Sequence, residues 1–250
     1  MTEPSADDLL FEVPPPPTPV ERLLALADRY TQHNDTLDLL LADRDEPNPD
    51  THVAAAQDLA SETLATIKAI HDERLYESAE LSDALVRLKQ LAYLSTASAG
   101  HGPQLARELT ALAPEAVLDS ATRVAGETRR RRWSNAPPPE NSFSAAQRAA
   151  LHEIARGHVV VTGSTERRYV HHRTVRVLIS TLRSLESMAL IARKPKSSAP
   201  AYIDGPPQDR IHLTATGATA LATILSLPPA TTTGPSPRPA TSTQTATRSR

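Results

Sequence analysis

Guanidinium and hydroxyl side chains recur at a helical spacing near position 180, at Arg173, Arg176, Ser180 and Arg183. On a helix these four side chains share one face, because successive residues are about 100° apart. Guanidinium groups present planar donors that match phosphate oxygens and guanine edges, and a serine hydroxyl can bond to either. The pattern indicates nucleic-acid binding. A solvated polar face that binds nothing is the alternative.

More cations flank this segment on both sides. Residues 167 and 168 precede it, and a short stretch of three cations follows it. A separate run of four arginines at 129–132, next to Trp133, offers a second contact with phosphate or a minor groove. That run equally suits a helix C-terminus, where cations oppose the helix dipole. The candidate DNA contacts are Arg173, Arg176, Ser180, Arg183, Arg193, Lys194, Lys196, Arg167, Arg168, Arg130 and Arg131.

The net charge of −2 conceals two halves of opposite sign. Residues 142–227 contain 11 basic and five acidic side chains, a formal charge of +6, whereas residues 1–128 contain 9 basic and 23 acidic ones, a charge of −14. Only the basic half is suited to an anionic partner.

Motifs for other chemistry are missing from the sequence. It has no cysteine, no phosphate-binding Gly-Lys-Ser/Thr loop, no dinucleotide fingerprint and no His-Glu-x-x-His pair. His158, His171 and His172 lack a cysteine or carboxylate pattern that would complete a metal site, so a basic strand surface is expected there. We therefore predict a non-catalytic protein without a cofactor.

The basic half must fold to position its cations. Ser144 to Gln147 match a capping box that begins a short helix, and a β segment follows at 158–162. Apolar spacing predicts a helix over 174–189 with Val175, Leu178, Leu182, Leu185 and Ala189 inside. Strands are expected at 190–194 and 210–213, around a basic loop.

This half resembles winged-helix transcription regulators of the MarR and PadR type. The resemblance rests on the apolar run Leu182, Leu185, Met188, Leu190, Ile191, on Arg193, on Arg210–Leu213, and on Leu213–Leu221, which fits Leu-Thr-x-x-Gly-x-x-Ala-Leu. It implies that Arg176, Ser180 and Arg183 enter the major groove, and that Arg193, Lys194 and Lys196 contact the backbone or minor groove. It also implies a small-molecule effector pocket between the two domains.

One segment departs from that family pattern. A winged helix has another short helix before its recognition helix, but 163–173 has room for little more than a turn. Residues 158–162 and 167–172 are instead expected to pair as a hairpin. Winged helices also dock proteins, so a non-catalytic adaptor is the alternative function.

The acidic half is predicted to be helical. A helix is expected over 20–43, one long helix or two over 53–100, and two pieces over 104–128, with Ala113 outside the helical region because Pro114 follows. These helices form either a closed bundle or a homodimer. Asn34, on the apolar stripe of the first helix, would fix register if buried in a coiled coil, but a solvent-facing edge is favoured.

The expected fold is therefore mainly α, with an N-terminal helical bundle or long antiparallel helices and a C-terminal α+β winged-helix domain. Without a signal peptide or an apolar run of 18 residues, a cytoplasmic, nucleoid-associated bacterial regulator is expected. The predicted divisions are a disordered Pro-rich arm at 1–19, an acidic helical domain at 20–128, a basic linker at 129–141, the winged helix at 142–227 and a disordered tail at 228–250.

Overall fold

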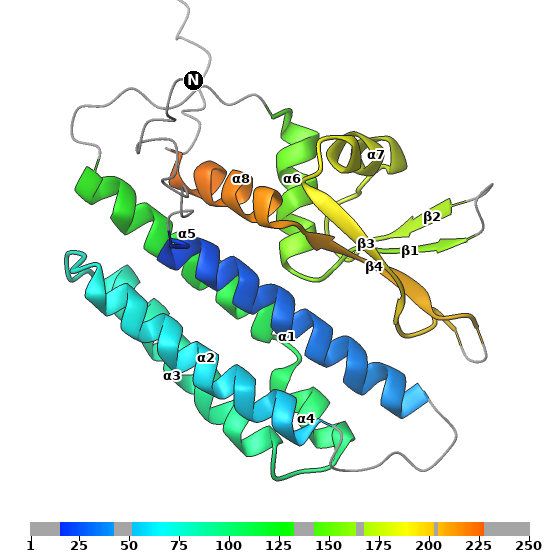
Figure 1. Cartoon of the computed structure of the whole chain (residues 1–250), viewed down its shortest axis with the longest axis horizontal. Helices are drawn as coiled ribbons and strands as arrows, with labels where there is room; N and C mark the ends of the chain where they lie inside the picture. Colours follow the sequence, from blue (N-terminus) through cyan, green and yellow to red (C-terminus); the bar gives the residue numbers. More distant parts are fainter. Residues whose placement is uncertain (1–15, 43–51, 133–142, 164–167, 203–204, 228–250) are drawn as a thin grey trace, which may run out of the picture.

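The computed structural model describes residues 16–42, 52–132, 143–163, 168–202 and 205–227. These residues form a mainly helical molecule in which a layer of five helices packs against a smaller α+β unit (Figure 1). The predicted arm up to residue 15, the tail from 228, Trp133 and Arg167 lie outside the described residues.

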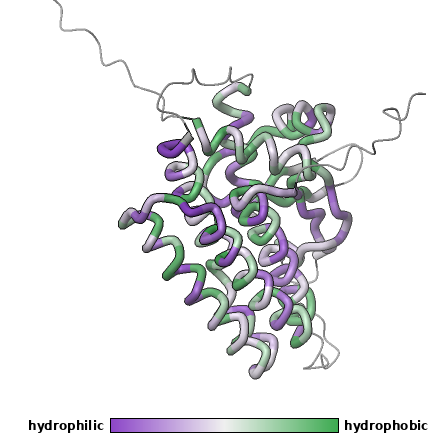
Figure 2. Tube along the Cα trace, turned by 60° about the vertical axis from the view of Figure 1, so that its left-hand side comes forward, coloured by the Kyte–Doolittle hydropathy of each residue, from purple (hydrophilic) through white to green (hydrophobic). Residues whose placement is uncertain are grey.

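The helical layer follows the apolar spacing of the sequence, and hydrophobic positions recur along its helices (Figure 2). The expected helix over 20–43 is confirmed, and the stretch 53–100 forms two helices, the second capped by Ser78, whose hydroxyl accepts from the Leu81 N–H at 3.1 Å. The five helices are α1 (Pro19–Ala42), α2 (Val53–Asp72), α3 (Ala79–Ser98), α4 (Pro103–Thr110) and α5 (Ala113–Arg132).

The boundaries of α5 differ from the prediction at both ends. The split into two helical pieces is confirmed, but Ala113 is the first residue of α5 rather than a residue outside it. Pro114 is tolerated there because an N–H in the first turn has no intrahelical acceptor. At the other end, residues 129–132 continue α5 instead of forming a linker. Arginine is a good helix former and its charge opposes the dipole at a helix C-terminus.

Helix α1 lies between the rest of the helical layer and the α+β unit (Figure 1). On one side the Tyr30 hydroxyl bonds to Thr63 of α2 at 3.0 Å and to Ser95 of α3 at 2.7 Å. On the other side α1 packs against the sheet. Buried side chains of both predicted domains therefore form one continuous hydrophobic core.

Asn34 is buried in this core and does not face solvent as expected. Its Nδ2 donates to the Thr110 carbonyl at 2.9 Å, and its Oδ1 accepts from the Thr110 hydroxyl at 2.7 Å. Both polar ends of the amide are satisfied within the chain, which removes most of the cost of burial.

The α+β unit contains a four-stranded antiparallel sheet in the order β2-β1-β4-β3. The capping box at Ser144 and Gln147 is confirmed, and Gly157, with a φ of +73°, ends the first helix of the unit. Its elements are α6 (Ala145–Ala155), β1 (Val160–Gly163), β2 (Arg168–His171), α7 (Ile179–Ser187), β3 (Ile191–Ser198), β4 (Gln208–Leu213) and α8 (Ala215–Ser226).

Strands β1 and β2 confirm the predicted hairpin. Val160 pairs with His171 and Val161 with Val170, while β1 also pairs with β4. The second expected hairpin is present as well, because β3 and β4 pair from Ile191 and Leu213 outward. Between β1 and α7, the described residues contain no additional helix.

Helix α7 is shorter than predicted, because residues 174–178 precede it in a non-helical conformation. Val175 and Leu178, which were expected inside, are 40% and 47% exposed, and Val177 is buried instead. The β-branched residues Thr174, Val175 and Val177 have low helix propensity, and tertiary packing of Val177 is incompatible with the predicted helical face.

The buried imidazole of His33 makes stability depend on pH. Burial, together with the nearby His52 and Arg107, lowers the pKa of His33 from 6.5 to about 4. As pH falls below 6.5, the unfolded chain takes up a proton that the folded chain does not, so stability is lost between about pH 6.5 and pH 4. When the pH is lowered from about 7 to 4.5, we expect the His33→Gln variant to lose about 2 kcal/mol less unfolding free energy than the wild type. Urea unfolding at both pH values measures this.

The exposed His71 provides the matched control, because His71→Gln removes an imidazole that is not buried. An equal pH dependence in wild type and His33→Gln would contradict the prediction.

Candidate nucleic-acid interface

Three of the predicted contacts are exposed on and beside α7. Ser180 and Arg183 lie on the helix, whereas Arg176 lies three residues before it begins, so these residues do not form the single helical face that was predicted. Neither guanidinium group has a hydrogen bond or ion pair with another residue that the structure describes. Figure 1 shows α7 on the side of the α+β unit remote from the helical layer. We call Arg176, Ser180 and Arg183 the α7 surface.

Arg173 is exposed but is already engaged within the chain. Its Nη1 lies 3.1 Å from Oε1 of Glu115 on α5, and its side chain is 68% exposed. An ion pair this open to solvent contributes little to stability. Arg173 therefore belongs to the junction with the helical layer.

The cations of the β3–β4 hairpin are divided between the two sides of the sheet. Arg193 faces α7, where it pairs weakly with Glu186 at 3.8 Å and lines a small cavity with Leu182. Lys194 faces α1, with Nζ 3.4 Å from Oε1 of Gln32. Lys194 and Lys196 both line a cleft of about 210 Å³ between β3 and α1. Successive strand residues point to opposite faces, so consecutive basic residues cannot share one surface.

The other predicted contacts are not brought to α7. Arg130 pairs with Glu127 at 2.5 Å and with Glu80 at 3.9 Å, and Arg131 donates to the Glu73 carbonyl. Figure 1 places this end of α5 away from α7. Arg168 lies on β2, opposite Gly163.

Sequence reasoning missed a polar stripe on α1 that binds the α+β unit. The Asp28 carboxylate lies 2.7 Å from Nδ1 of His212, and the Asp35 carboxylate pairs with Arg210. Gln32 meets Lys194, and Glu21 accepts from the Thr219 hydroxyl at 2.5 Å. These α1 residues lie at helical spacing, opposite the apolar stripe. The signal available in the sequence was this acidic stripe together with a basic strand that needs a counter-charge.

Arg210 is the centre of this contact. Its guanidinium group is 11% exposed and donates to both carboxylate oxygens of Asp35, at 2.7 and 2.5 Å. It also donates to the Gly157 carbonyl at 2.6 Å and to the Ser198 hydroxyl at 3.1 Å. A two-pronged pair of this kind fixes orientation as well as charge. Arg210 is therefore committed to the fold and cannot contact DNA.

A second contact joins α5 to the α+β unit through His158. Its Nε2 lies 2.7 Å from Glu115 and its Nδ1 lies 3.1 Å from Glu153. Burial raises the pKa of Glu153, but hydrogen bonds from His158 and Arg156 outweigh burial and lower it. The expectation of a basic strand surface is wrong for His158, whose side chain is 8% exposed and paired with carboxylates, whereas His171 and His172 are exposed.

Neither a metal centre nor a membrane span is found in the part of the chain that the structure describes. No group of three His, Cys, Asp or Glu residues is placed there to hold an ion. Its longest helices are not apolar enough to cross a bilayer.

Searches for similar proteins found no counterpart of this chain. No protein-family model, no curated protein and no solved structure matches it.

Proposed function

We propose that this chain is a bacterial DNA-binding protein that contacts duplex DNA through the α7 surface. The observation that carries the proposal is the pair of exposed guanidinium groups, Arg176 and Arg183, which have no intramolecular partner among the described residues. Ser180 lies between them in the sequence, and α7 itself is on the side of the α+β unit remote from the acidic helical layer (Figure 1). Guanidinium groups in this setting can neutralise phosphates and read guanine edges.

The α+β unit would act as a winged-helix variant. In this proposal α7 is the recognition helix, the β3–β4 hairpin is the wing, and the β1–β2 hairpin replaces the usual second helix. Helix α7 has nine residues and is therefore about 13 Å long, a size that the major groove, about 12 Å wide, can accommodate. Arg193, on the α7 side of the sheet, would add a backbone contact. Lys194, Lys196, Arg130 and Arg131 would contribute less, because they lie toward α1 or at the end of α5.

A transcription regulator at the bacterial nucleoid would act as a homodimer through its helical layer. Helix α3 exposes Val86 and Tyr93, which are seven residues apart and therefore share a face. A second copy that covers this face would give the assembly two α7 surfaces, as operators with two half-sites require.

A protein-docking adaptor is the second candidate function, and one observation favours it. Three apolar side chains, Val175, Leu178 and Met188, are at least 40% exposed at the two ends of α7. Exposed apolar side chains beside polar ones are a feature of many protein contacts. In that case the binding energy comes from these groups, and the neighbouring arginines matter little.

The two functions predict different effects of removing charge from the α7 surface. We expect Arg176→Ala with Arg183→Ala to weaken binding of a labelled random-sequence duplex about 10–100-fold and to reduce the salt slope by up to about two phosphate contacts. Fluorescence anisotropy at low and moderate salt measures both quantities. The full chain is required, because a fragment that begins near residue 129 lacks α1 and most of α5, which share its core.

A matched control removes the same charge elsewhere. Lys68 on α2 and Arg74, just after α2, are exposed, so Lys68→Ala with Arg74→Ala should leave DNA affinity nearly unchanged. If both double variants bind DNA like the wild type, or if the wild type does not bind even at low salt, the DNA proposal fails and the docking function is favoured.

A further inference from the structure

The segment that leads into α7 is not held in place by backbone hydrogen bonds. Among the described residues, no backbone–backbone hydrogen bond involves residues 173–177, and α7 begins only after Leu178. The position of this segment therefore depends on the side chains around it. Val177 is buried in the core, and Arg176 beside it belongs to the α7 surface. The contacts that fix the segment thus also fix the place at which Arg176 is presented.

Two acidic side chains from different helices anchor this segment. On α5, Oε1 of Glu115 lies 3.1 Å from Nη1 of Arg173. In the last turn of α6, the side chain of Glu153 is 1% exposed, and the backbone N–H of Val175 stabilises its ionised carboxylate. The segment is therefore held at residues 173 and 175, immediately before Arg176.

His158 joins the two anchors to each other. Its Nε2 lies 2.7 Å from Oε1 of Glu115, the oxygen that Arg173 also contacts, and its Nδ1 lies 3.1 Å from Oε2 of Glu153. Ionised carboxylates only accept hydrogen bonds, so both ring nitrogens must donate, and an imidazole has two N–H groups only when it is protonated. The arrangement therefore requires an imidazolium.

The charged and titratable groups around His158 come from several parts of the fold. They are Glu115 and Asp119 on α5, His152, Glu153 and Arg156 at the end of α6, Arg173 before α7, and Arg210 on β4, which donates to the Gly157 carbonyl. Burial and the nearby Arg156 lower the pKa of His152, so this imidazole carries little charge at neutral pH. Arg156 donates to Oε1 of Glu153 at 2.9 Å. A neutral His158 would have to give up either Oε2 of Glu153 or Oε1 of Glu115.

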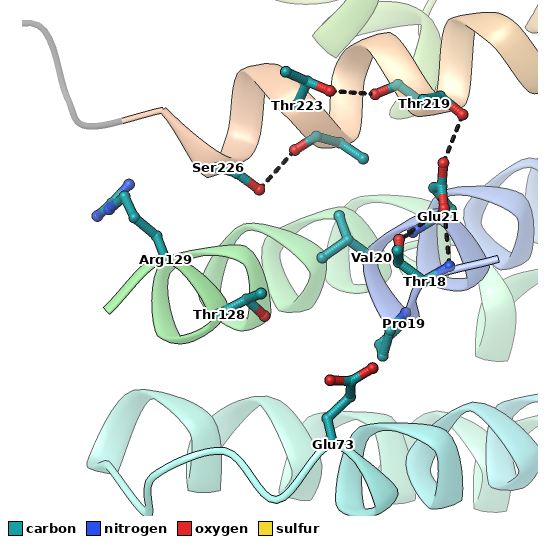
Figure 3. Close-up of a pocket in the computed structure, with 11 residues that line it drawn as sticks. Thr18, Pro19, Val20, Glu21, Glu73, Thr128, Arg129, Thr219, Thr223 and Ser226 are labelled. Carbon is teal, nitrogen blue, oxygen red and sulfur yellow. Dashed lines mark hydrogen bonds between the residues drawn. The ribbon is translucent and has the colours of Figure 1, made fainter. Parts of the chain in front are cut away.

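Other polar contacts between the helical layer and the α+β unit involve different elements. Figure 3 shows Glu21 of α1 accepting from Thr219 of α8, at 2.5 Å, and Asp35 of α1 pairs with Arg210 of β4. Within the described part of the chain, the pair of Arg173 with Glu115 is the ion pair that joins residues 173–178 to the helical layer.

We propose that Glu153 and the imidazolium of His158 are positioning residues for the α7 surface, because they hold residues 173–178, and with them Arg176, at a fixed place against α5. When His158 loses its proton, one of its two contacts is lost and the segment is held less firmly. The benefit of this positioning for DNA binding rests on the proposed function, whereas the link itself does not.

Hydrogen exchange tests the link without DNA. The amides of Val175 and Val177 are followed by NMR in the full chain and corrected for the intrinsic exchange rate. In the wild type we expect protection to be roughly tenfold greater at pH 6 than at pH 8, because one charge-assisted hydrogen bond is lost over the range in which histidine changes charge. His158→Gln should abolish this difference. Glu115→Ala, at a side chain that is 36% exposed, should lower protection at pH 6 to the wild-type level at pH 8.

Matched controls change the same chemical groups beside this link. His171→Gln removes an exposed imidazole on β2, and Asp119→Ala removes a carboxylate one turn further along α5 that bonds to Arg87. Both should keep the wild-type pH difference, and circular dichroism verifies that each variant is folded. The proposal is overturned if wild-type protection does not change with pH, or if His158→Gln keeps the change.

DNA affinity at pH 6 tests whether the link positions Arg176. Removal of an acidic group should by itself strengthen the binding of an anion. We nevertheless expect Glu115→Ala to bind a labelled duplex roughly threefold more weakly than Asp119→Ala, because Arg176 is less well placed. Equal affinities of the two variants would overturn the positioning role. If the wild type binds no DNA but shows the expected exchange pattern, the proposed function fails and the link between α5 and the α7 surface stands.

Discussion

Asp35→Ala is expected to lower the free energy of unfolding by about 3–5 kcal/mol. The substitution leaves the Arg210 guanidinium group 11% exposed, with a charge that no other carboxylate in its contacts balances. The Gly157 carbonyl and the Ser198 hydroxyl accept hydrogen bonds but carry no counter-charge. Chemical unfolding by urea, followed by circular dichroism, measures the change.

Two controls distinguish an unpaired buried charge from simple loss of a contact. Asp119→Ala breaks the exposed pair with Arg87, whose separation is 3.4 Å, and should cost no more than about 0.5 kcal/mol. Replacing Asp35 and Arg210 together by leucine removes both charges and should recover most of the lost stability. A cost for Asp35→Ala as small as that for Asp119→Ala would contradict the expected role of this pair.

The Asp35–Arg210 pair also explains how the opposite charges of the two halves are used. Acidic groups of α1 meet Arg210 and His212 on one side of the sheet, where Lys194 donates to the Gln32 amide. On the other side, the α7 surface presents Arg176 and Arg183 without such partners among the described residues. The charge asymmetry of the sequence therefore has two contributions. Some of the opposite charges pair with one another and join α1 to the sheet. The remaining positive charges, at the α7 surface, support the proposed DNA contact.

Local patterns in the sequence were sufficient to predict most elements. Apolar spacing located α1, α2 and α3, and the capping box at Ser144 marked the start of α6. Both hairpins were predicted as well. These features depend on residues that are close in the chain, where spacing determines which side chains share a face.

The candidate site was predicted less well because it depends on contacts between distant residues. Apolar spacing placed Val175 and Leu178 inside a longer helix, but packing buries Val177 and begins the helix after Leu178. Asp35 and Arg210 are 175 residues apart, so no spacing rule could pair them. For the same reason Asn34 was expected at a solvent edge, although Thr110, 76 residues away, binds it in the core.

Gly217 connects a sequence phrase to a steric requirement that only the fold reveals. It is the glycine of the Leu213–Leu221 match, and it lies in the first turn of α8, where its N–H donates to the Thr214 hydroxyl at 3.0 Å. A Cβ at this position would be 1.9 Å from the Leu190 carbonyl oxygen and 2.9 Å from its carbon. The Leu190 carbonyl cannot easily withdraw, because it accepts from the Thr214 N–H at 3.0 Å and Leu190 is buried.

Gly217→Ala is therefore expected to destabilise the fold by about 3 kcal/mol, since overpacking against fixed backbone outweighs the higher helix propensity of alanine. Gly126→Ala is the matched control, because Gly126 also lies in a helix and its Cβ would meet no atom within 4 Å. That substitution should stabilise the protein by up to about 1 kcal/mol. Urea unfolding of both variants provides the comparison. Equal stability changes in the two would show that the contact between α8 and Leu190 yields easily, and the steric explanation for this glycine would then be wrong.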